Sequence, residues 1–258
     1  MVIFYILGLK ISHRPIFNLN TIIIWLVFIC SYSYASSLNF LYDTKTDKIN
    51  KRENIFLKYK IDLFKIKKLS GAILITGFVL CFFTASPLYT QIIYITLVIS
   101  GYLYSYPVFK LSHKAFYKLF LMTLNYCFLP GLLGIIQNFT KYSLYTILTF
   151  SLFYSSWLLY TDVKDIKGDK KVGKNTFAVI LGLKKLTMLS ATISISAVFI
   201  VSYLLIINDT KILIILYSAV LVQGALIIKR NWLTNKIYKN IVGYYLLLSF
   251  LGITLLIK

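Results

Sequence analysis

Acidic residues at helical spacing in one short segment suggest a surface that binds a cation. In "NFLYDTKTDKIN", residues 39–50, Asn39, Asp43 and Asp47 follow one another at intervals of four residues. If a helix continues through this segment, each step of four turns the chain by about 40°, so the three side chains share one face. The chain contains 28 Lys+Arg but only 8 Asp+Glu, which makes this clustering of carboxylates unusual for its composition.

A second acidic segment lies more than a hundred residues later. In "YTDVKDIKGDKKVGKNTFAV", which begins at Tyr160, Asp162, Asp165 and Asp169 are spaced by three and four residues, again one helical face. Two facing sets of carboxylates suit a hard divalent cation, and Mg²⁺ prefers a few carboxylates together with substrate phosphates. The two segments therefore predict a magnesium site for a phosphate ester.

Basic residues and glycines alternate with these acids. The interleaved lysines, which could neutralise a phosphate ester, are Lys45, Lys48, Lys164, Lys167 and Lys170. Gly168 and Gly173 would let the backbone approach an anion closely. The alternative is that the acids only solvate basic loops. Seven of the eight acids fall in the two loops 43–68 and 162–185, at helical spacing, which favours the functional interpretation.

The elements that hold these residues are predicted to be membrane-spanning helices. The chain of 258 residues is 59% hydrophobic, and its mean hydropathy is +0.77, far above that of a soluble domain. Apolar runs of the length that crosses a bilayer occupy residues 21–41, 69–86, 88–106, 119–136, 142–160, 186–207, 212–228 and 241–257. Backbone polar groups in lipid must be satisfied locally, so we expect an all-α, multi-pass bundle of eight spans forming one domain.

The distribution of charge predicts topology rather than nucleic-acid binding. The net charge is +20, but the basic residues concentrate in alternate connections: nine in 43–68, three in 107–118, seven in 162–185 and four in 229–239. Such asymmetry marks the cytoplasmic side, so both acidic loops should be cytoplasmic, in what we expect to be a bacterial cytoplasmic membrane. The same charges would attract anionic membrane lipids. Residues 1–15 are too short to span and are expected to be irregular, interfacial or the remnant of a first helix.

The motifs resemble those of the UbiA superfamily of intramembrane prenyltransferases. The likeness lies in the N-x3-D-x3-D motif beginning at Asn39, in the D-x3-D motif beginning at Asp165, and in a G-x2-T segment at Gly173. A further similarity is "YLYSYPVFK", in which Tyr104 opens the family's Tyr-Ser-x-Pro loop and Lys110 stands where a basic residue is usual. The chain departs from the family pattern in showing eight spans rather than nine and in lacking an Arg-Pro after the first motif.

This resemblance implies a site and a reaction. Asp43, Asp47, Asp165 and Asp169 would hold Mg²⁺ and the diphosphate of a prenyl donor, and would carry catalysis. The implied donor-binding residues are Asn39, Lys45, Tyr104, Lys110, Asp162 and Lys170. The reaction would transfer a polyprenyl group to an acceptor, expected to be aromatic, as in the synthesis of quinones or related lipids. The acceptor and the prenyl length are left open.

Two other functions are compatible with the same composition. A terpene cyclase of the same superfamily would ionise a prenyl diphosphate without an acceptor. A cation-coupled transporter would use the carboxylates as an ion path, but its acids should lie near the middle of the bilayer on interrupted helices. Here the acids are predicted at helix ends, which favours the enzyme.

Overall fold

The computed structural model describes residues 1–49 and 61–205, and these form helices together with one isolated bridge between Lys114 and Asn175. The α-helices are α1 (Val2–Ile11), α2 (Leu19–Tyr42), α3 (Thr44–Ile49), α5 (Leu63–Cys81), α6 (Pro87–Ser105), α7 (Ala115–Thr123), α8 (Leu129–Ile135), α9 (Lys141–Leu158), α10 (Ile166–Lys171) and α11 (Phe177–Leu205). The intervening short elements are the 3₁₀ helices η1 (Leu111–His113), η3 (Ile136–Asn138) and η4 (Leu159–Asp165), and the π-helical turn η2 (Leu124–Phe128). The predicted all-α class is confirmed.

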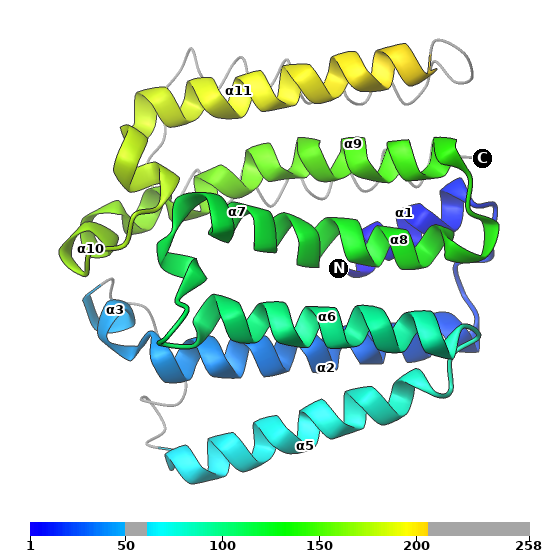
Figure 1. Ribbon diagram of the computed structural model, residues 1–258, viewed down its shortest axis with the longest axis horizontal. Helices are drawn as coiled ribbons and strands as arrows, with labels where there is room; N and C mark the ends of the chain where they lie inside the picture. The colour runs from blue at the N-terminus through cyan, green and yellow to red at the C-terminus, as the bar shows by residue number, and fades with distance from the viewer. Residues whose placement is uncertain (50–60, 206–258) are drawn as a thin grey trace.

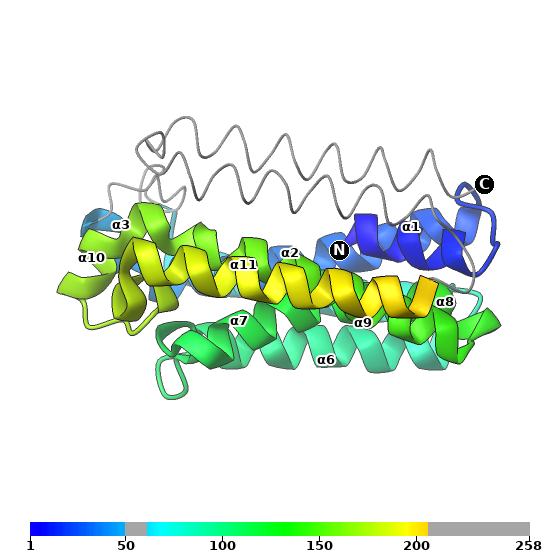
Figure 2. The ribbon, with the colours of Figure 1, turned by 90° about the horizontal axis from the view of Figure 1, so that it is seen from above.

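Long helices lie side by side and place their connections at two opposite ends (Figure 1). Helix α2 packs against α5 and α6, α1 against α8, and α9 against α11. Both views place α3 and α10 together at one end, whereas the α5–α6 and α8–α9 turns lie at the other (Figure 2). This arrangement brings the two acidic segments to the same end of the bundle.

Three segments of the described ranges are long and apolar enough to cross a membrane: Leu19–Tyr42, Ala115–Asn138 and Phe177–Ala197. Helices α6 and α9, of 19 and 18 residues, match the predicted spans 88–106 and 142–160 to within two residues at each end. Helix α5, of 19 residues, only overlaps the predicted span 69–86, since it begins at Leu63 and ends at Cys81. The predicted spans 212–228 and 241–257 lie outside the described residues.

One predicted span is interrupted, and another belongs to a helix that is broken just before the predicted span begins. The span expected at 119–136 consists of α7, the π-turn η2 and α8, and Pro130 stands at the start of α8. Proline has no amide hydrogen to give to the helical ladder, which accounts for a widened turn directly before it. The span expected at 186–207 belongs to α11, which begins earlier, at Phe177. This helix is broken at Gly182, before the predicted span, and a residue with a side chain would adopt the φ of 66° found there only with strain.

The N-terminal segment is a short helix inside the bundle rather than an irregular or interfacial stretch. Residues Phe4 to Leu9 of α1 are all buried. A Cβ added at Gly8 would lie 2.8 Å from the Cα of Gly134, so α1 and α8 approach with no side chain between them at this point. Ser12 Oγ lies 3.1 Å from the carbonyl oxygen of Gly134, which holds the end of α1 to α8. Small residues that allow such contact are typical of helix packing in membranes.

Candidate functional site

The first acidic segment keeps its helical register although the helix itself ends. Helix α2 finishes at Tyr42, and Asp43 caps it with φ −97° and ψ 12°, so the expected continuous helix is interrupted at this residue. The amide of Asp43 donates to the carbonyl of Asn39 at 2.9 Å, and the amide of Asp47 donates to the carbonyl of Asp43 at 2.9 Å. The spacing of four therefore persists from α2 into α3, where Asp47 is only 3% exposed.

The second acidic segment is not the single α-helix that the spacing predicted. Asp162 and Asp165 lie in the 3₁₀ helix η4, and Asp169 lies in α10. Residues three apart eclipse one another in a 3₁₀ helix, so the interval of three still places Asp162 and Asp165 on one side. All three aspartates are buried, with exposed fractions of 8%, 4% and 4%. Buried carboxylates are costly without cationic or hydrogen-bonding partners.

Lys174 is one such partner, and it links the two segments. Its Nζ lies 3.0 Å from Oδ2 of Asp43, and both side chains are largely buried. Its backbone amide donates to the carbonyl of Asp169 at 2.9 Å. Gly173, with a φ of 72°, turns the chain out of α10 immediately before Lys174. The lysine thus contacts the first motif through its side chain and the second through its backbone.

A second buried lysine pairs with an aspartate of the second acidic segment. Lys118, near the start of α7, forms an ion pair with Asp162. Neither Lys118 nor Lys174 was among the predicted site residues. Both lysines belong to segments that stand out in the sequence. Lys174 falls within the Gly173-x2-Thr176 segment, and Lys118 is the last residue of the basic connection 107–118. Sequence spacing gives no indication of which lysine reaches which acid, since both pairings depend on the packing of distant helices.

Burial and neighbouring charge shift two titrations at this end of the bundle. Burial raises the pKa of Asp169 above its ordinary value, and Lys118 and Lys174 oppose that rise. Burial, reinforced by the positive charge of Lys174, lowers the pKa of His113 to about 4, while Asp43 opposes the change. His113 is therefore neutral at pH 7. Its carbonyl oxygen accepts from the amide of Asn175 at 2.9 Å, which ties the loop before α7 to the segment after α10.

Oxygen donors of the two acidic segments are of the type that holds Mg²⁺. Within residues 1–49 and 61–205, no three His, Cys, Asp or Glu side chains are arranged to enclose an ion by themselves. Mg²⁺ in phosphate-handling sites takes one or two carboxylates and completes its shell with substrate phosphates and water. Separate carboxylate sets at one end of the bundle, with buried lysines between them, fit an ion that binds together with a diphosphate.

The other predicted residues lie in varied surroundings. Asn39 and Tyr104 line a common cavity. Lys110 is half-buried and has a left-handed backbone, with φ 40° and ψ 49°. Lys170 is exposed on α10. The side chain of Lys45 lies outside the described part of the structure.

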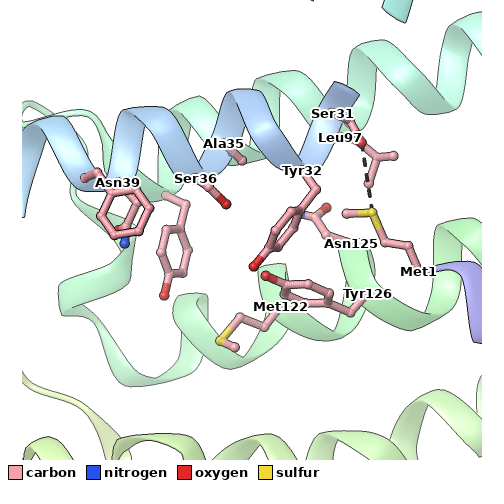
Figure 3. Close-up of a pocket in the computed structure, with 13 residues that line it drawn as sticks. Met1, Ser31, Tyr32, Ala35, Ser36, Asn39, Leu97, Met122, Asn125 and Tyr126 are labelled. Carbon is pink, nitrogen blue, oxygen red and sulfur yellow. Dashed lines mark hydrogen bonds between the residues drawn. The ribbon is translucent and has the colours of Figure 1, made fainter. Parts of the chain in front are cut away.

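A cavity of about 390 Å³ runs inward from the first acidic segment (Figure 3). Its near end is formed by Asn39, Phe40 and Tyr104, and its far end by Met1 and Ser31. Asn39 is one turn of helix before Asp43, so the cavity begins beside the first motif. A long, largely apolar molecule with an anionic head could place its head among the aspartates and lysines and its tail between the helices.

Comparison with known proteins agrees with this architecture. The UbiA prenyltransferase family matches residues 1–251. The chain is 29% identical over 173 residues to the 2-acylphloroglucinol 4-prenyltransferase of Humulus lupulus, which covers 60% of this chain and 40% of that protein. The chain therefore spans less than half the length of this relative.

Solved structures show the same fold at lower identity. A UbiA homologue from Archaeoglobus fulgidus superposes with a TM-score of 0.77 at 16% identity, covering 99% of this chain and 94% of that one. The same homologue bound to DMAPP and Mg²⁺ gives a TM-score of 0.75, also at 16% identity, with 98% and 94% covered. A structure concerning digeranylgeranylglyceryl phosphate synthase gives 0.70 at 22% identity, with 99% and 92% covered. The family match covers nearly the whole of this chain, and the helical bundle and the two acidic segments agree with it. The chain belongs to the UbiA prenyltransferase family.

Proposed function

We propose that this protein transfers a prenyl group from its diphosphate to an aromatic acceptor inside the membrane, with Mg²⁺. The observation that carries the proposal is the bridge made by Lys174, which contacts Asp43 with its side chain and Asp169 with its backbone. Asp43 follows Asn39, where the cavity begins, by one turn of helix. One end of the bundle thereby offers carboxylates for a metal, buried cations for a diphosphate and an adjoining space for an isoprenoid tail.

The anionic head of the donor binds among the acidic segments. Asp43, Asp47, Asp165 and Asp169 are the residues that would hold Mg²⁺, which would supply positive charge to the diphosphate and weaken its bond to the allylic carbon. Lys174 and Lys118, which neutralise Asp43 and Asp162 in the structure, are placed to turn toward the diphosphate. The remaining residues that we assign to the donor are Asn39, Lys45, Tyr104, Lys110, Asp162 and Lys170.

The bond between the allylic carbon and the diphosphate oxygen breaks, and its electron pair leaves with the diphosphate. Lysines aimed at the departing group stabilise the charge that develops on it. The allylic cation forms beside Phe40 and Tyr104, which line the cavity and can stabilise positive charge through their ring faces. An electron-rich ring carbon of the acceptor attacks the cation, and the departed diphosphate then takes the proton from that carbon, which restores the aromatic ring. Exclusion of water by the surrounding helices protects the cation from hydrolysis.

Several features support an enzyme of this kind over a transporter. The acids lie on short elements at one end of the bundle, whereas a transport path would place them near its middle (Figure 1). The Humulus lupulus relative is named for prenyl transfer to an acylphloroglucinol, which is a phenolic acceptor. We assign the chain as one integral-membrane domain of a bacterial cytoplasmic membrane, with cytoplasmic acidic loops and a role in quinone or related lipid synthesis.

A transfer assay on membranes tests the proposal. Membranes containing the protein are incubated with radiolabelled geranylgeranyl diphosphate, Mg²⁺ and a panel of phenolic acceptors, with and without excess EDTA. Asp43→Asn and Asp169→Asn should each lower turnover by about a hundredfold or more, by analogy with the loss of other transition-state stabilising groups. The double variant should lose little more turnover than either single variant, because substitutions of groups that act as one unit have non-additive effects.

Asp62→Asn is the matched control, since Asp62 is exposed and caps α5 by accepting from the amide of Phe64, which asparagine can also do. Its turnover should equal that of the wild type. Turnover that persists in excess EDTA, or that survives either single substitution in the acidic segments, would refute the proposed mechanism.

A further inference from the structure

Two cavities meet at a pair of tyrosines. The cavity that begins at Asn39 and a second cavity of about 400 Å³ are both lined by Tyr32, Tyr126 and Met1. The second cavity is bounded elsewhere by Ile3 of α1 and Ile29 of α2, which are 39% and 56% exposed. The first cavity thus leads from the acidic segments to the tyrosine pair, and the second leads from that pair to the apolar outer surface.

From this arrangement we propose that Tyr32 and Tyr126 form a gate that sets which prenyl chain lengths the protein accepts. The inference rests on the proposed function, since it assigns the cavity to the donor tail. Tyr32 lies seven residues before Asn39 on α2, a rise of roughly 10 Å along the helix. A short tail ends before the gate, whereas a long tail has to pass between the two rings.

The rings face one another from different elements. Tyr32 belongs to α2 and Tyr126 to the π-turn η2, and their centroids are 6.2 Å apart at an interplanar angle of 63°. Figure 3 shows both hydroxyl groups directed toward the Asn39 side of the cavity. An edge-to-face pair of this kind contributes only about 0.5–1.5 kcal/mol beyond its buried area, so a tail of several apolar units can displace it.

Neither ring is fixed by a hydrogen bond from its hydroxyl group to another described residue. Tyr94, in contrast to Tyr32 and Tyr126, is held in place by its hydroxyl group, which donates to the carbonyl of Leu74 at 2.8 Å, and its ring is fully buried. Moving Tyr94 would break a hydrogen bond, whereas moving Tyr32 or Tyr126 breaks none to the described residues. Tyr126 also lies in a π-turn, a feature that often marks functional positions in helices.

Beyond the gate, a long tail finds surroundings that suit a hydrocarbon. Ile3, Phe28 and Ile29 line the second cavity, and the exposed isoleucines face outward from a protein whose helices are suited to lipid. Each apolar group that enters this space from water gains free energy in proportion to the area buried. Once the gate is open, additional isoprene units should therefore strengthen binding, and with the gate closed they should not.

Competition binding with unreactive donors tests the gate without knowledge of the acceptor. Purified full-length protein with Mg²⁺ binds radiolabelled geranylgeranyl diphosphate, which is displaced by the S-thiolodiphosphate analogues of geranyl, farnesyl and geranylgeranyl chains. In Tyr32→Ala and Tyr126→Ala, the geranylgeranyl analogue should gain about fivefold to tenfold in affinity relative to the geranyl analogue, which corresponds to roughly 1–1.4 kcal/mol. Tyr32→Trp should change the ratio in the opposite direction.

Tyr145→Ala is the matched control, because Tyr145 is 47% exposed on α9 and Tyr32 is 49% exposed, and Tyr145 lines neither cavity. Unchanged geranyl affinity in each variant shows that the fold and the diphosphate site are intact. Ratios that stay within about twofold of wild type in both alanine variants, or that change equally in Tyr145→Ala, would overturn the gate while leaving the proposed function standing. Failure of all three analogues to bind the wild-type protein would overturn both.

Discussion

The ammonium group of Lys174 lies 3.0 Å from the carboxylate of Asp43, although the two residues are 131 positions apart in the chain. The backbone amide of Lys174 also binds the carbonyl of Asp169. Two acidic segments from different halves of the protein are therefore joined by one residue before any ligand is bound. A diphosphate that draws the ammonium group away from Asp43 would leave that carboxylate available to a metal ion.

Lys174→Met should destabilise the protein, because it leaves the buried carboxylate of Asp43 without its cation. Removal of one partner of a buried ion pair typically costs about 3–5 kcal/mol. Thermal melting in detergent measures the effect, with the exposed Lys170→Met on α10 as the control. The double variant Lys174→Met/Asp43→Asn should recover part of the loss, with a coupling of about 0.5–3 kcal/mol. Purely additive losses would show that the two side chains do not interact.

Lys110→Gly should separate stability from donor binding. Lys110 adopts a φ of 40°, which costs a residue with a side chain roughly 1–2 kcal/mol and glycine almost nothing. The variant should therefore melt at a higher temperature, while its affinity for geranylgeranyl diphosphate should fall because a cation is lost. Lys114→Gly, at a position with an extended backbone, should not gain stability. An unchanged donor affinity in Lys110→Gly would remove Lys110 from the site.

Acid sensitivity should depend in part on His113. Because its pKa is about 4 in the folded protein and near 6.5 in an unfolded chain, the folded state binds fewer protons between these values. Stability should therefore fall as the pH drops from 6.5 to 4. The raised pKa of Asp169 has the opposite effect on stability. As the pH falls toward the ordinary pKa of aspartate, this carboxyl group binds more protons in the folded state than in the unfolded chain, which stabilises the fold. The melting temperature of the wild type should fall relative to that of His113→Gln as the pH is lowered from 6.5 to 4.

Gly8→Ala should impair the fold. The added Cβ would lie 2.4 Å from the carbonyl oxygen of Gly131 and 2.8 Å from the Cα of Gly134, and backbone atoms cannot yield as a flexible side chain does. Overpacking of this kind costs about 1–3 kcal/mol. Gly71→Ala on α5 is the control, because its Cβ would meet nothing within 4 Å and alanine favours a helix by up to about 1 kcal/mol. Equal melting temperatures of the two variants would contradict the close contact of α1 with α8.

Single cysteines at Thr46 and Lys167 test the orientation in the membrane. They are introduced after replacement of the native Cys30, Cys81 and Cys127. Because basic residues concentrate on the cytoplasmic side, both positions should be protected from an impermeant maleimide in intact cells and labelled after permeabilisation. Labelling of either position from outside would reverse the assigned topology.

The helices and acidic segments were predictable because their patterns are local. Apolar runs of bilayer length predicted α2, α5, α6 and α9. The spacing of Asn39, Asp43 and Asp47 is preserved in the backbone hydrogen bonds, even though the helix breaks at Asp43. The break itself was not predicted, since nothing in the local pattern distinguishes a cap from a continuing helix.

The lysine pairings and the tyrosine pair could not be predicted in the same way. Lys118 reaches Asp162 from a helix 44 positions away, and Tyr32 meets Tyr126 across a cavity. Such contacts depend on which helices become neighbours. The burial of α1 also depends on its partners, because a ten-residue apolar segment has no local feature that distinguishes a buried helix from one on a membrane surface.

The contact between Gly8 and Gly134 has a consequence for biogenesis. Ser12 and the Gly134 carbonyl that it approaches are 122 positions apart, so α1 is synthesised long before the helix that covers it. A ten-residue helix is too short to cross a bilayer by itself. Helix α1 can therefore reach its buried position only after α8 has emerged from the ribosome, and until then it lies at the membrane or is bound by the insertion machinery. Ribosome-bound chains that are too short for α8 to have left the ribosome should therefore carry α1 in a protease-sensitive state, and chains long enough to expose α8 should protect it.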